Sequence, residues 1–102
     1  MPEVPQPRQS DQVVAALTGE LDLATVGEMK ASLAEAATDV GGHVVLDMSA
    51  VTFIDAAALG VLVEAANKSQ ASGGSFGLRN LTPAVERVLR ITGLHESLVA
   101  KS

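Results

Sequence analysis

Three short apolar segments alternate with three segments whose apolar residues recur at helical spacing, and this order is the strongest constraint on the fold. Strands are predicted over residues 13–19, 43–49 and 75–80, the first of them ending in a turn at Gly19. Each is followed by a predicted helix. Repeated strand–helix units of this length favour a mostly parallel sheet with helices packed on it. The order therefore predicts an α/β fold.

Each predicted helix has recognisable end signals. Thr25 and Glu28 have the spacing of a capping box. In this motif the Thr25 side chain accepts from the backbone N–H of Glu28, and the Glu28 side chain accepts from the backbone N–H of Thr25. Asp55 is a favourable N-cap for the second helix. Thr82 precedes a proline at the start of the third helix, and Gly93 is expected to end it.

The length of 102 residues fits one domain. Residues 1–11 are rich in proline and poor in apolar groups, so we expect a flexible N-terminal arm with at most a short edge strand around Val4. Residues 12–102 are expected to form the domain, with a last short strand over 97–100.

The charge balance argues against nucleic acid and membrane surfaces. Seven basic and twelve acidic residues give a net charge of -5, and aromatic residues make up 2% of the chain. Nucleic-acid binding uses basic side chains against phosphate and aromatic rings against bases, and an anionic membrane would repel the chain. No apolar run is long enough for membrane insertion and no signal peptide is evident. We therefore expect a cytoplasmic protein.

The sequence offers little chemistry for catalysis. Cysteine is absent, and neither His43 nor His95 has a metal-ligand spacing. Asp22, Asp47 and Asp55 are predicted near strand ends, but no nucleophile accompanies them. We therefore expect no enzymatic activity, no cofactor and no metal.

A binding function requires no reactive side chains, only a suitable surface. Asp22 and Asp55 are predicted at the carboxyl ends of neighbouring strands, where open α/β sheets commonly meet ligands and partners. Gly60 lies inside the second predicted helix, where it costs about 1 kcal/mol relative to alanine. Either a partner requires a flat helix surface there, or the helix packs tightly against the sheet.

Three blocks of the chain resemble the STAS domain of bacterial anti-sigma factor antagonists (anti-anti-sigma factors): LTGELDLAT, VVLDMSAVTFIDAAALGVLVEA and LTPAVERVLRITGL. The likeness extends from about Val13 to the C-terminus. It implies a single domain with four or five strands in a mostly parallel or mixed sheet and three to four flanking helices. Because the chain ends soon after the third block, the family's last helix is expected to be missing.

The middle block is the most specific part of the likeness. The family pattern is D-L-S-x-V-x-F-[ILM]-D-S-S-G-L-x-x-L, and this chain matches it at Asp47, Ser49, Val51, Phe53, Ile54, Asp55 and Leu59. In the family, the serine after the motif Asp is phosphorylated by a partner anti-sigma factor of the serine kinase type, and the complex then dissociates. Here Ala56 stands at that position and Ala57 follows it. Neither can accept a phosphoryl group.

The likeness therefore implies an anti-sigma factor antagonist that lacks the usual phosphoserine switch. Three origins of Ala56 stay open: a natural non-phosphorylatable antagonist, an engineered variant, or a protein outside sigma-factor control. Thr52 is the one neighbouring hydroxyl that we regard as a substitute acceptor. The expected partner-binding residues are Asp22, Thr52, Asp55, Ala56, Ala57, Leu59 and Gly60.

Two other functions remain as alternatives. The first is a subunit of a lipid-transport or sensory assembly, in which the helix after Asp55 docks on an ATPase subunit or a receptor. The second is binding of a small molecule such as a nucleotide near the Asp22 and Asp55 turns. The sequence identifies neither the sigma factor nor the oligomeric state.

Overall fold

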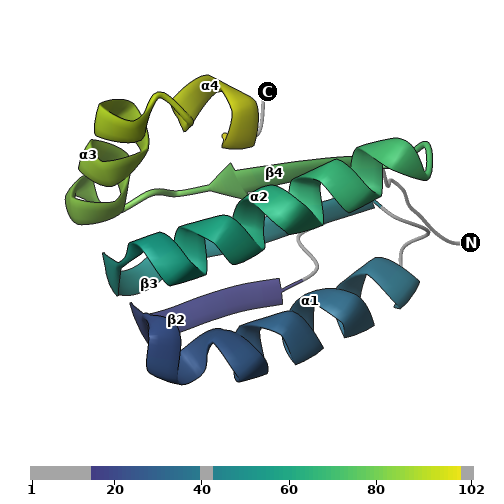
Figure 1. Ribbon diagram of the computed structural model, residues 1–102, viewed down its shortest axis with the longest axis horizontal. Helices are drawn as coiled ribbons and strands as arrows, with labels where there is room; N and C mark the ends of the chain where they lie inside the picture. Colours follow the sequence, from purple (N-terminus) through teal and green to yellow (C-terminus); the bar gives the residue numbers. More distant parts are fainter. Residues whose placement is uncertain (1–14, 40–42, 100–102) are drawn as a thin grey trace, which may run out of the picture.

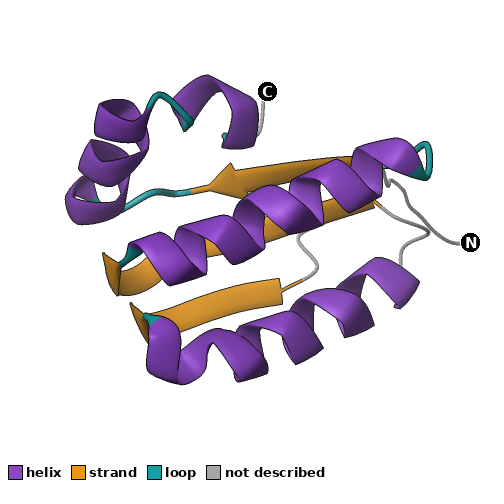
Figure 2. Ribbon diagram, viewed as in Figure 1, coloured by secondary structure: helices purple, strands orange, loops and turns teal. Residues whose placement is uncertain are grey.

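The computed structural model describes residues 15–39 and 43–99, which form a parallel sheet flanked by helices (Figure 1, Figure 2). In this part of the chain the sheet has three strands in the order β2-β3-β4. The predicted alternation of strands and helices is confirmed. The predicted arm and the strand around Val4 lie outside the described residues. The elements are β2 (Ala15–Leu21), η1 (Leu23–Thr25), α1 (Val26–Asp39), β3 (His43–Ile54), α2 (Ala56–Ala71), β4 (Ser75–Arg79), α3 (Pro83–Thr92) and α4 (His95–Leu98).

The central strand β3 organises the core. Val44, Leu46 and Met48 alternate along it and are all buried, whereas Val45 and Asp47 between them are half-buried. Because successive strand side chains point to opposite faces, one face of the sheet carries the core. Helices α1 and α2 run side by side along the sheet, and α3 packs against β3 (Figure 1). None of the described helices has both the length and the apolar character needed to cross a membrane.

The first strand does not end at Gly19, so the predicted turn there is wrong. Strand β2 continues to Leu21, and its register against β3 shifts between Gly19 and Glu20. Gly19 has a φ of +76°, a left-handed conformation that glycine adopts easily. The irregular pairing accommodates Gly19 in the way that a β-bulge accommodates an extra residue, so the strand continues to Leu21.

The central strand is longer than predicted. It was expected to stop at Ser49, but β3 extends to Ile54. Its second half pairs with β2, where Val51 is opposite Gly19 and Ile54 is opposite Leu21. Residues 51–54 are also β-branched or aromatic, so the sequence itself held a strand signal for this extension.

The helix ends agree better with the sequence. Asp55 caps α2, Thr82 caps α3 and Gly93 ends α3 in the left-handed conformation, all as predicted. The predicted last strand is wrong for its described part: α4 occupies the segment up to Leu98, and only an isolated bridge joins Val99 to β4. A helical turn places Leu98 in the core, at 1% exposure, above the partly buried Leu94.

Substitution of two glycines should separate backbone strain from helix propensity. We expect Gly19→Ala to lower the free energy of unfolding by about 1–2 kcal/mol, because an L-residue is strained at positive φ. Gly60→Ala, in the exposed face of α2, should raise it by about 0.5–1 kcal/mol. Urea denaturation of both variants measures these changes. A destabilised Gly60→Ala, or a Gly19→Ala as stable as the parent, would contradict these assignments.

Candidate functional site

Two strand-to-helix connections meet at the carboxyl ends of β2 and β3, at the left end of the sheet in Figure 1. The last residues of the strands, Leu21 and Ile54, are paired in the parallel ladder. The backbone N–H of Asp55 donates to the carbonyl oxygen of Leu21 at 3.0 Å, so the two connections are direct neighbours. We name this surface the Asp22–Asp55 edge, and its members are Asp22, Leu23, Thr52, Phe53, Asp55, Ala56, Ala57 and Gly60.

The Asp22 carboxylate closes the first connection. Its Oδ1 accepts hydrogen bonds from the N–H groups of Ala24 at 3.0 Å and Thr25 at 3.2 Å, and the Thr25 hydroxyl accepts from the N–H of Asp22 at 3.0 Å. This is a capping box. The prediction that Thr25 caps the helix together with Glu28 is therefore wrong. Because η1 leads directly into α1, the first unpaired N–H groups are those that follow Asp22.

Asp55 binds both connections at once. Its Oδ1 accepts from the N–H of Ala58 at 3.0 Å and caps α2. Its Oδ2 accepts from the N–H of Leu23 at 3.2 Å, across 32 positions of the chain. The two oxygens thus satisfy one N–H in the first turn of α2 and one in η1. Asp55 fixes the position of the Asp22 turn relative to the start of α2.

The first turns of α2 expose small residues only. Ala56 and Gly60 are exposed and Ala57 is half-buried. A Cβ added at Gly60 would meet no atom within 4 Å, so the alternative of tight packing against the sheet is wrong. The described part of the chain gives no internal reason for a glycine at this position.

The remaining predicted contact residues differ in exposure. Thr52, the predicted substitute acceptor, is exposed. Leu59 is 7% exposed and belongs to the core cluster. It therefore lies on the inner side of α2 and is not one of the exposed residues of the edge.

Two exposed apolar residues at this edge were not predicted. Leu23 in η1 is 75% exposed and Phe53 near the end of β3 is 48% exposed. A signal for Phe53 was available: adjacent strand residues face opposite sides, so with Ile54 in the core Phe53 points outward. Leu23 lies three residues before Val26, a spacing that predicts an inward position in a continuous α-helix. Leu23 instead lies in η1, ahead of the first residue of α1, and Val26 itself is only half-buried, so the spacing does not place Leu23 in the core.

Asp47 and the two histidines make their contacts away from this edge. Asp47 lies within β3, where the N–H and hydroxyl of Ser49 and the amide of Asn80 donate to its carboxylate and lower its pKa. His43 bonds the hydroxyl of a serine on β4, and His95 lies near a glutamate on α3. Among residues 15–39 and 43–99, no cluster of His, Asp or Glu could hold a metal ion.

Comparison with known proteins identifies the family. The model of the STAS domain matches residues 3–101, so the chain belongs to the STAS domain family. The single STAS-like α/β domain predicted from the motifs is thereby confirmed.

Solved structures with the same fold include anti-sigma factor antagonists. A protein from Thermotoga maritima with a provisional assignment to this class has a TM-score of 0.73 at 28% identity, over 86% of this chain and 80% of its own. An anti-sigma factor antagonist from Mycobacterium paratuberculosis has a TM-score of 0.73 at 27% identity, over 89% and 78%. The anti-sigma factor antagonist SpoIIAA, in its unphosphorylated form, has a TM-score of 0.70 at 20% identity, over 92% and 85%, and shares the fold.

Variants of Asp55 test its bridging role. Asp55→Ala removes both acceptors and should lower the free energy of unfolding by about 1–3 kcal/mol. Asp55→Asn keeps one acceptor oxygen, which is enough to cap α2, and should cost only about 1 kcal/mol. Urea denaturation compares the two variants. Equal stability of Asp55→Ala and the parent protein would contradict the bridge between α2 and η1.

Proposed function

We propose that this protein is an anti-sigma factor antagonist that binds a kinase-type anti-sigma factor through the Asp22–Asp55 edge, in the cytoplasm. The observation that carries the proposal is the exposed, hydroxyl-free start of α2, where Ala56 and Gly60 lie beside the exposed side chains of the same edge. The likeness to antagonists at 27% and 28% identity supports the same class.

The composition of this edge is that of a docking surface. Leu23 and Phe53 offer apolar contact area, and aromatic residues are enriched among those that contribute most to binding. The small residues of α2 let a partner approach the helix backbone closely. Asp22 and Asp55 hold the edge in shape through backbone hydrogen bonds, so the surface is ordered before a partner arrives.

The same geometry explains what a phosphoryl group would do at position 56. It would add a charge of about -1.5 to -2 beside the carboxylate of Asp55, at the centre of the surface. The charges of the two surfaces would no longer be complementary, and the phosphate would keep water in the contact between them. With Ala56 this modification cannot occur, so we propose that abundance of the protein or another signal controls the complex.

Charge at position 56 should break the complex. We expect Ala56→Glu to weaken binding to the anti-sigma factor captured from the source cells by about tenfold to a hundredfold, because the carboxylate mimics part of the phosphate charge. Ala84→Glu, at an exposed position in the first turn of α3, is the matched control and should bind like the parent protein. Calorimetric titration measures both.

The Ala56→Ser variant tests the kinase assignment itself. Incubated with the captured partner and ATP, it should gain one phosphoryl group at position 56, whereas the parent protein should gain none. Mass spectrometry locates the phosphate. Phosphate on Thr52 of the parent protein would contradict the loss of the switch. Capture of an ATPase subunit of a transporter, with no anti-sigma factor, would instead favour the lipid-transport alternative.

A further inference from the structure

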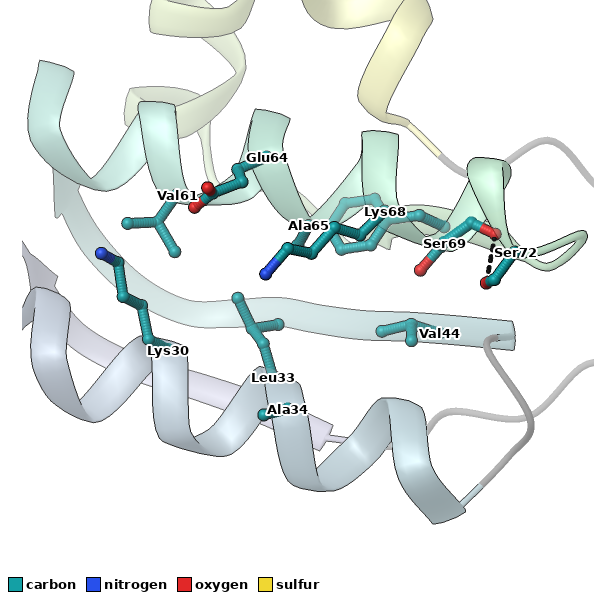
Figure 3. Close-up of a pocket in the computed structure, with 11 residues that line it drawn as sticks. Lys30, Leu33, Ala34, Val44, Val61, Glu64, Ala65, Lys68, Ser69 and Ser72 are labelled. Atoms are coloured by element: carbon teal, nitrogen blue, oxygen red, sulfur yellow. Dashed lines mark hydrogen bonds between the residues drawn. The ribbon is translucent and has the colours of Figure 1, made fainter.

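A second surface feature lies away from the Asp22–Asp55 edge. Between α1 and α2, with its floor on β3 and β4, there is a cavity of about 520 Å³ (Figure 3). This volume falls within the range of about 300–1,000 Å³ that small-molecule sites occupy. None of the residues that line the cavity belongs to the Asp22–Asp55 edge.

The walls of the cavity are mainly apolar. Leu33 from α1, Val61 and Ala65 from α2, Val44 from β3 and Phe76 from β4 all line it. Such walls favour a ligand with an aliphatic body, because burial of apolar surface is the main source of affinity. The hydroxyl-bearing residues Ser69 and Ser72 lie at the end of the cavity farther from Lys30 (Figure 3), and the volume of the cavity suits a ligand of medium length.

Two ammonium groups give the cavity a preference for anions. Lys30 from α1 and Lys68 from α2 are two of the chain's three lysines, and both line it. Figure 3 shows their side chains reaching into the space between the helices. Glu64 is the one acidic residue in the lining, so the local charge is positive in a chain with a net charge of -5. In the described part of the chain, neither lysine forms an ion pair.

We propose that this cavity binds a medium-chain fatty carboxylate whose head group contacts Lys30 and Lys68. The alkyl chain lies against the apolar wall formed by Leu33, Val44 and Phe76. The two ammonium groups come from different helices, so a bound carboxylate links α1 to α2. This site is separate from the Asp22–Asp55 edge and does not depend on the proposed function.

Titration of decanoate into the isotope-labelled protein, below the concentration at which decanoate forms micelles, tests the site by two-dimensional NMR. We expect saturable shifts of backbone amides around Leu33, Ala65 and Ser69, and little change at Ala56. Decanol lacks the charge and inorganic phosphate lacks the chain, so each should bind at least about tenfold more weakly than decanoate. Equal binding of decanol, or no saturable shift with decanoate, would overturn the proposal.

Charge variants complete the test. Lys30→Gln and Lys68→Gln should each weaken decanoate binding by about tenfold. Arg87→Gln removes the same charge from an exposed position on α3 outside the cavity and should leave binding unchanged. All three positions are exposed, so the variants should unfold at the temperature of the parent protein. Loss of affinity in Arg87→Gln equal to that in the lysine variants would mean a nonspecific charge effect and refute the site.

Discussion

The hydrogen bond between the Asp55 carboxylate and the N–H of Leu23 is the interaction on which the shape of the candidate site depends. It joins two connections that are distant in sequence and adjacent in the sheet. Because the other oxygen of Asp55 caps α2, the start of that helix and the Asp22 turn are held in one arrangement. These two hydrogen bonds of Asp55 therefore determine where the exposed residues of the edge lie.

This arrangement separates two roles of the family motif. The motif Asp, Asp55, has a structural role, because its two carboxylate oxygens accept hydrogen bonds from backbone N–H groups of this chain. The position after it is exposed and makes no such contribution, so a hydroxyl can be lost there without cost to the fold. The proposed antagonist therefore keeps the form of the surface and lacks the residue by which a kinase would silence it.

Local signals in the sequence predicted the order of elements and the caps at Asp55, Thr82 and Gly93, because capping depends on a few neighbouring residues. They predicted the meeting of Asp22 and Asp55 for a topological reason: parallel strands end at the same edge. They failed at Gly19, where pairing between distant strands decides the conformation. Beyond Ser49 a local signal existed, because residues 51–54 are β-branched or aromatic, but the segment was predicted as a connection. The exposed Leu23 was also missed, because it lies in η1, outside the helical periodicity of α1.

The central claim is that the start of α2 is the contact surface for an anti-sigma factor. Photo-crosslinking in the source cell tests it most directly, with a photoreactive amino acid placed at position 56 and, as a control, at position 84 on α3. Mass spectrometry then identifies the attached protein. The account predicts an adduct with a kinase-type anti-sigma factor at position 56 and none at position 84. Attachment of that partner at position 84 alone, or of unrelated proteins only at position 56, would contradict it.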